Sequence, residues 1–169
     1  MDLYEAIRSR HSVRAYQDKP VEAEKLQRIL DAGRLAPSAR NRQQWKFVVV
    51  RDAGVRKAVA EAAEQPFVGE APVVIAVVGL TPNEKMYCDV PTDPVDCAIA
   101  IEHMALAATA EGLGTCWIGH FKQDDCRKAL GVPKTAKVIE LLPLGYPATS
   151  APPKRRKPVE EVVCYDRYA

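Results

Sequence analysis

The segment Val95-Asp-Cys-Ala-Ile-Ala-Ile-Glu-His-Met-Ala-Leu-Ala-Ala-Thr-Ala-Glu111 decides the fold. The helix that this stretch predicts is apolar around most of its circumference, at Ala98, Ile99, Ile101, Met104, Ala105, Leu106 and Ala108. A helix of this kind has to be buried. The chain has 169 residues, enough for one domain with a core, so we expect a central helix or a helix at a subunit interface. His103 on this helix is interpreted as a core residue with satisfied polar atoms.

Helical and strand patterns alternate on both sides of this segment. The predicted helices are a short one capped by Asp2 and three more over 22–35, 53–64 and 124–130. Short apolar runs predict strands over 47–50, 72–80, 115–118 and 138–144. Residues 81–94 contain three prolines and predict a loop. Two leading helices followed by alternation predict an α+β fold, with a mixed central sheet flanked by helices on both faces.

The composition is that of an ordinary globular protein, with 47% hydrophobic and 27% charged residues. The net charge of +2 is too small to indicate nucleic acid as the main partner. The longest apolar stretch, 71–80, is well short of a membrane span. The first residues lack a basic segment followed by an apolar run, so no signal peptide is predicted, and we expect a cytoplasmic protein.

The cysteines argue against a disulfide framework. There are five, at positions 88, 97, 116, 126 and 164, and none forms a C-x-x-C pair. The odd count and the spacing exclude a zinc knuckle as well, and each cysteine is interpreted as a buried structural thiol. Cys116 with His120, and Asp93 with Asp96, have spacings found in metal sites, but no third and fourth ligand is nearby, so no metal is expected.

A basic segment, Arg10-His11-Ser12-Val13-Arg14, follows the first predicted helix. It offers two guanidinium groups, a hydroxyl and backbone donors within five residues, a set that suits a phosphate or another anion. The alternative is a solvated basic turn, and on this pattern alone the alternative is the better interpretation.

A segment rich in amides and hydroxyls, Ala36-Pro-Ser-Ala-Arg-Asn-Arg-Gln-Gln-Trp45, connects a predicted helix to a predicted strand. Asn and Gln side chains can recognise the donor and acceptor edge of a heterocycle. A helix stop followed by a turn is the structural alternative.

A glycine-rich segment, Gly112-Leu-Gly-Thr-Cys-Trp-Ile-Gly119, follows the long helix. It is not a dinucleotide-binding fingerprint, because Trp117 takes the place of the third glycine and a helix precedes it. Backbone approach to a flat ligand is one interpretation, with Gly119 leaving room. A helix C-cap and a strand form the other.

The tail begins at Pro152 with the basic run Lys154-Arg-Arg-Lys157 and continues with apolar residues at 159, 162, 163 and 165. Alone, the basic run is typical of a nucleic-acid or targeting patch, or of a solvated tail. The apolar part has little of its own chain to pack on, so we expect it to lie across a partner subunit.

In this order and at these spacings, the four segments resemble the nitroreductase family of FMN-dependent enzymes. The resemblance rests on R-H-S-x-R, P-S-x-x-N-x-Q-x-W, G-L-G-T-C-W-I-G and K-R-R-K-P, and it extends over nearly all of one domain, 1–169. It implies a nitroreductase-like fold and an intertwined homodimer with two FMN sites at the subunit interface. It also implies that the tail over 152–169 packs on the partner.

Individual roles follow from the resemblance, residue by residue. Arg10, Ser12, Lys154 and Arg156 are similar to phosphate ligands, and Arg14 is similar to a cation at the pyrimidine end of the ring. The cofactor-binding set that it implies is Arg10, His11, Ser12, Arg14, Pro37, Ser38, Asn41, Gln43, Ile118, Gly119, Lys154 and Arg156, with residues 37–43 supplied by the other subunit. The backbone of Ile118 and Gly119 resembles the part that faces the reactive ring nitrogen.

The implied reaction transfers hydride from NADH or NADPH through FMN to a small electron acceptor, a nitroaromatic compound or a quinone, in a ping-pong cycle. FMN performs this chemistry itself, so no catalytic side chain is expected. The family's larger members insert a helical excursion near 80–94, where this chain has a short loop. Phe67, Met86 and Tyr87 are therefore the candidate walls of the substrate pocket.

Two alternatives remain open. The first is a flavin enzyme of the same fold that performs reductive dehalogenation or fragments the flavin. The second is a non-enzymatic module that binds nucleic acid through the basic tail, although that run is only four residues long.

Overall fold

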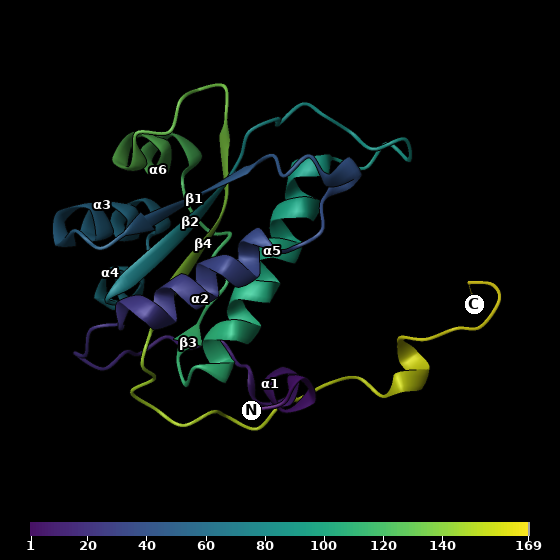
Figure 1. The fold of residues 1–169 in the computed structure, drawn as a ribbon, viewed down its shortest axis with the longest axis horizontal. Coiled ribbons are helices and arrows are strands. Elements are labelled where there is room, and N and C mark those ends of the chain that lie inside the picture. Colours follow the sequence, from purple (N-terminus) through teal and green to yellow (C-terminus); the bar gives the residue numbers. More distant parts are fainter. Residues whose placement is uncertain (169) are drawn as a thin grey trace.

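A four-stranded sheet runs through the centre of the protein in the order β1-β2-β4-β3 (Figure 1). The computed structural model describes residues 1–168 and gives the strands as β1 (Trp45–Val50), β2 (Val73–Gly79), β3 (Gly114–Thr115) and β4 (Lys137–Gly145). All neighbouring strands of the described chain pair antiparallel, so the sheet is antiparallel where a mixed sheet was predicted; a parallel contact occurs as an isolated bridge between Ser12 and Thr115. All seven residues of β2 are buried, as expected for a strand covered on both faces.

Helices cover both faces of the sheet, which confirms the predicted α+β architecture (Figure 1). On one face lie α3 (Ala53–Ala63), α4 (Pro66–Glu70) and α6 (Gln123–Leu130). On the other face lie α2 (Ala23–Arg34) and α5 (Thr92–Ala110), with α1 (Leu3–Ser9) against α5. The alternation of β2 divides the core: Val74, Ala76 and Val78 face the first layer, and Val73, Ile75 and Val77 face the second.

Some element boundaries differ from the prediction. Helix α5 begins at Thr92 instead of residue 95, because a proline such as Pro94 fits the first turn of a helix, where no intrahelical donor is required of it. The third strand ends at Thr115, and beyond it only Ile118 returns to the sheet, by a bridge to Leu141. The short helix α4 was not predicted from the sequence.

Helix α5 is buried on one side only within a single chain. Ala100, Ile101, Met104, Ala105 and Ala108 are buried in the domain core. A second set of apolar residues on α5 is only half-buried: Val95, Ala98, Ile99 and Leu106. Within a single chain, this second side of α5 is therefore only partly covered.

Two expectations about buried residues are wrong. His103 is exposed, and its Nδ1 lies 3.3 Å from the carbonyl oxygen of Ala32, because it is on the side of α5 that the sheet does not cover. Cys97, Cys116 and Cys126 are buried, but Cys88 and Cys164 are exposed, since they belong to the loop before α5 and to the tail.

A β-bulge distorts β4 at one point. Val77 pairs with Glu140 and Val78 pairs with Val138, so Ile139 is an extra residue on β4. In a bulge two residues of one strand oppose a single residue of its neighbour. The bulge therefore places Ile139 and Glu140 together opposite β2, close to the point where Ile118 rejoins the sheet.

The C-terminal tail leaves the body of the molecule (Figure 1). It first passes α1, where Nζ of Lys154 donates a hydrogen bond of 2.9 Å to the carbonyl oxygen of Ile7. It then projects outward through a short 3-10 helix at Val159–Glu161, and residues 148–168 are all exposed. Within residues 1–168, no helix combines the length and the apolar character needed to cross a membrane.

Candidate functional site

The basic segment after α1 is fixed directly against β3. The N–H of Val13 donates to the carbonyl oxygen of Thr115 at 2.9 Å, and Ser12 forms the parallel bridge to the same residue. The two backbones approach closely because residue 114 is glycine: a Cβ there would lie 2.4 Å from Cγ2 of Val13. Two of the four predicted segments, about a hundred residues apart in sequence, are thus in contact.

Three cations gather at the end of α1. The side chain of Arg10 is 21% exposed, and its Nε lies 3.8 Å from Oε1 of Glu102 on α5, a weak ion pair. Desolvation, followed by the charges of Arg10 and Arg156, lowers the pKa of Lys154, and Glu102 acts in the opposite sense. Arg10 and Arg156 are therefore both close enough to repel Lys154, and the carboxylate of Glu102 acts against this repulsion. Such a cluster favours a bound anion.

The buried thiol of Cys116 is influenced by several charged and polar side chains around it. Desolvation raises its pKa, whereas Arg14, a hydrogen bond with Ser12 and the charge of Arg10 act in the opposite sense. Glu140 raises the pKa further. The side chains of the basic segment and of Glu140 therefore lie around the start of the turn that leads to Gly119.

His11 lies at the end of α1, where its Nδ1 is 3.1 Å from the carbonyl oxygen of Ser9. The ring is half-buried and joins the basic segment to the preceding helix.

The backbone of Ile118 and that of Gly119 differ in what they can bind. Ile118 exchanges two hydrogen bonds with Leu141, of 3.0 and 3.1 Å, so its N–H and its carbonyl are both occupied. The N–H of Gly119 has no hydrogen-bond acceptor among residues 1–168. Gly119 can therefore donate to a ligand, whereas Ile118 holds the turn against β4.

Glu140 is a site residue that sequence analysis missed. A Cβ on Gly119 would lie 3.5 Å and 3.6 Å from the two carboxyl oxygens of Glu140, so this carboxyl lies directly beside the glycine. It is half-buried, and within residues 1–168 it forms neither a hydrogen bond nor an ion pair. Desolvation raises its pKa to about 7. The available signal was one acidic residue in the apolar run 138–144.

The amide-rich segment lies near the first turn of α5, away from the cations beside the later turns of that helix (Figure 1). Both carboxyl oxygens of buried Asp96 accept from the N–H of Ala39 at 3.1 Å. The Oγ of Ser38 accepts from the N–H of Gln43 at 2.9 Å, and Nε2 of Gln43 donates to the carbonyl oxygen of Asn41 at 3.1 Å. Pro37, Ser38, Asn41 and Gln43 are thus held together, but apart from Arg10 within one chain.

The residues predicted to form the walls of the substrate pocket lie in two separate places. Met86 and Tyr87 line a cavity of about 240 Å³ together with Arg40 and Thr92, next to the amide-rich segment. The Arg42–Glu84 ion pair joins the two loops that form it. Phe67 lies on α4 and packs into the core on the opposite face of the sheet, so the structure does not bring it to this cavity.

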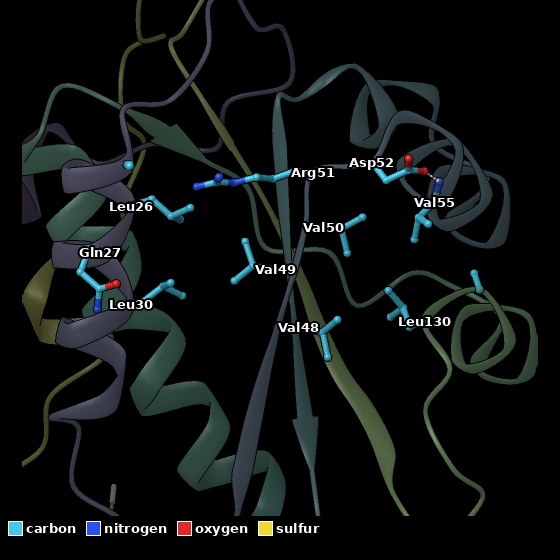
Figure 2. Close-up of a pocket in the computed structure, with 12 residues that line it drawn as sticks. Leu26, Gln27, Leu30, Val48, Val49, Val50, Arg51, Asp52, Val55 and Leu130 are labelled. Carbon is cyan, nitrogen blue, oxygen red and sulfur yellow. Dashed lines mark hydrogen bonds between the residues drawn. The ribbon is translucent and has the colours of Figure 1, made fainter.

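A separate hollow, of about 690 Å³, contains none of the predicted site residues (Figure 2). Figure 2 shows Leu26 and Leu30 of α2 on one side of it, Val48 of β1 across its floor and Leu130 of α6 on the other side. β1 is an edge strand, since only β2 pairs with it. The groove is therefore apolar and bounded by an unpaired strand edge.

Comparison with known proteins gives a consistent result. The sequence model of the nitroreductase family matches residues 7–65 and 57–146. A Methanothermobacter thermautotrophicus protein provisionally named NADH dehydrogenase/NAD(P)H nitroreductase is 37% identical over 156 residues, which cover 88% of this chain and 78% of that protein. The NADH dehydrogenase of Thermus thermophilus is 32% identical, with 98% of this chain and 96% of the relative covered.

A solved structure shows the same fold. The crystal structure of a nitroreductase family protein from Clostridium difficile superposes with a TM-score of 0.89 at 31% identity, covering 99% of this chain and 100% of the other. More distant is the iodotyrosine deiodinase of Nematostella vectensis, which is 25% identical over 96% of this chain and 74% of its own length.

The raised pKa of Glu140 predicts a pH-dependent stability. The folded protein retains a proton that the unfolded chain releases near its ordinary pKa of 4.5, so the free energy of unfolding falls as pH rises from about 4.5 to about 7. The side chain is only half-buried, so solvent screening limits this loss to about 1–2 kcal/mol. Glu140→Gln should therefore be more stable than the wild type by that amount at about pH 8 and equally stable near about pH 4.5.

Urea unfolding of the FMN-free protein at both pH values measures the effect, and Glu61→Gln on the exposed face of α3 is the matched control. A Glu140→Gln protein no more stable than the wild type at the higher pH would show that burial does not suppress ionisation here.

Proposed function

Since the chain belongs to the nitroreductase family, we propose that it is an NAD(P)H-dependent flavin oxidoreductase that binds FMN between two copies of itself. The names of relatives support this class: one of them, 29% identical over 99% of this chain and 74% of its own length, is the FMN reductase [NAD(P)H] of Bacillus subtilis.

The observation that supports the proposal most directly is the meeting of Arg10 with Lys154 and Arg156. These cations come from the two ends of the chain, and the charges of Arg10 and Arg156 help to lower the pKa of Lys154. The FMN phosphate has about two negative charges near neutral pH. Each charge-assisted hydrogen bond to it stabilises the complex by about 1.5–3 kcal/mol, enough to offset the repulsion among the cations.

The remaining side chains then have consistent roles. Ser12 donates to the phosphate beside Arg10, and Arg14 approaches the pyrimidine end of the ring, where a cation stabilises added negative charge. His11 fixes the end of α1, and the free N–H of Gly119 would be available to donate to the reactive edge of the ring. Bound FMN supplies the redox chemistry, taking hydride from NADH or NADPH and passing electrons to a small acceptor in a ping-pong cycle.

The site is completed by a second subunit. Pro37, Ser38, Asn41 and Gln43 lie apart from the cations of their own chain, so in this proposal they contact the FMN bound by the partner. The half-buried apolar side of α5 supports a homodimer, because the single chain leaves it uncovered.

The tail supports the homodimer independently. Its apolar residues Val162 and Val163 are exposed, and the segment projects away from its own subunit (Figure 1). The apolar groove along β1 offers a complementary surface with an unpaired strand edge (Figure 2). We assign the partner's residues 159–168 to this groove, where an added segment pairs with the edge of the sheet.

Reductive dehalogenation is the second candidate, because a deiodinase is among the relatives. The acceptor distinguishes the two reactions. Reoxidation of the reduced protein by quinones or nitroaromatics, without release of halide from halogenated phenols, supports the first candidate. The reverse pattern supports the second.

The purified protein should be yellow, and its flavin absorbance should bleach on addition of NADH or NADPH under nitrogen and return with a quinone. Absorbance spectroscopy after reconstitution with FMN measures both steps. A protein that stays colourless and takes up no added FMN would contradict the proposal.

Arg10→Ala should weaken FMN binding about ten- to a hundredfold, the loss of one charge-assisted hydrogen bond. Quenching of FMN fluorescence measures the affinity. Arg8→Ala, an exposed arginine on the same helix, is the matched control and should bind FMN like the wild type. Equal affinity in the two variants would place the phosphate elsewhere.

Replacing Val162 and Val163 together by Asp should raise the dissociation constant of the dimer about a hundredfold, because the burial of two apolar side chains is lost. Sedimentation velocity across a range of concentrations measures this constant. The control is Glu160→Ala, which alters the same segment without removing apolar surface. A double variant that dimerises as tightly as the control would show that the tail does not stabilise the dimer.

A further inference from the structure

We propose that the carboxyl group of Glu140 controls how readily the flavin is reduced, by placing a titrating charge directly behind the Gly119 backbone that faces the ring. The inference rests on the proposed function and adds a residue to it.

The bulge in β4 produces this placement. Without the extra residue Ile139, the register set by Val78 and Val138 would pair Val77 with Ile139 and not with Glu140. The bulge instead brings Glu140 opposite Val77 and beside the turn that follows Ile118. The absence of a side chain on Gly119 lets the carboxyl oxygens approach this backbone, at the distances given above.

None of the described groups that face Glu140 forms an ion pair or a hydrogen bond with its carboxyl group. From β2 it meets Val77, and from the turn it meets Gly119 and the thiol of Cys116. The next ionisable residue on that turn, His120, lies 3.7 Å from Glu64 of α3 and is occupied there.

The other neighbouring elements contribute polar or distant groups. On α6, the side-chain amide of Gln123 is used by the backbone of Val138, with hydrogen bonds of 2.8 and 2.9 Å. Arg10 and Arg14 are the nearby cations, and they act on the same thiol as Glu140 does. In the proposed complex these two arginines are occupied by the phosphate and by the pyrimidine end of the ring.

A structural role alone does not explain the residue. An apolar side chain would satisfy this position at the edge of the core without the unfavourable desolvation of a carboxyl. Glu140 is a half-buried acid without a partner in the described chain, and its pKa is raised. The protonated and the ionised forms of its carboxyl are therefore present in comparable amounts near neutral pH. Its charge is therefore sensitive to a change of charge on a ligand a few ångströms away.

The direction of the effect follows from Coulomb's law. Reduction adds negative charge to the ring, so an ionised Glu140 opposes it and a protonated Glu140 does not. By linkage, reduction raises the proton affinity of the carboxyl by the same free energy. At pH values above about 7, the flavin should thus be harder to reduce in the wild type than in a variant with a neutral side chain at position 140.

The midpoint potential of bound FMN tests this directly, measured by equilibration with reference dyes from about pH 5 to about pH 9. Three FMN-loaded proteins are compared: the wild type, Glu140→Gln and the control Glu61→Gln. At about pH 8 the ratio of reduced to oxidised FMN at a fixed potential should be about tenfold higher in Glu140→Gln, while all three should coincide near about pH 5.

Coincidence of Glu140→Gln with the wild type at every pH would overturn the inference. A constant offset between them, with the same dependence on pH, would also overturn it, because a purely structural effect has that form. Failure of the wild type to bind FMN would instead refute the proposed function, and FMN uptake is measured first so that the two failures are distinguishable.

A measurement on the wild type alone covers the case in which the variant does not fold. Redox difference infrared spectroscopy at about pH 7 should show a protonated-carboxyl band that grows when bound FMN is reduced, since the carboxyl takes up a proton. A difference spectrum without any carboxyl band would overturn the inference as well.

Discussion

The site depends on one close backbone contact, in which the segment after α1 lies against β3. The hydrogen bond from Val13 to Thr115 fixes the register of this segment, and Gly114 makes the approach possible because any side chain there would clash with Val13. Successive residues of an extended segment point to opposite sides. With Val13 buried, Ser12 and Arg14 point outward, toward the turn that contains Gly119.

The electrostatics of the site follow from that contact. Arg10 ends α1, and Lys154 is tied to the last turn of the same helix by its bond to Ile7, so cations from both ends of the chain are held together. Mutual repulsion makes the arrangement unfavourable without a ligand and selects a ligand of high negative charge. The carboxyl of Glu140 lies beside Gly119 and also acts on Cys116, so a negative charge is available near this cationic site as well.

Local signals were sufficient for most of the helices and strands, although not for α4. The long apolar pattern predicted the burial of α5, and the β-branched runs predicted three of the four strands closely. Features that depend on packing between distant segments could not be predicted from the sequence. Phe67 packs into the core through α4, His103 is exposed on the side of α5 that the sheet does not cover, and Glu140 reaches the site only through a bulge. A bulge depends on pairing between strands that are distant in sequence, so the residues around Glu140 do not by themselves predict it.

The proposed division of the site between two chains has a physical reason. Helix α5 holds the amide-rich segment near its first turn through Asp96 and meets the cations through Glu102 farther along, so a single rigid helix keeps the two halves apart within one subunit. In the proposed homodimer, two antiparallel copies of this helix, packed through their half-buried apolar sides, would bring the first turn of one beside the later turns of the other. A twofold interface of this kind creates two equivalent sites from one surface. In this arrangement the apolar residues that a single chain leaves uncovered on α5 are the same residues that assemble the flavin site, so dimer stability and cofactor binding are coupled.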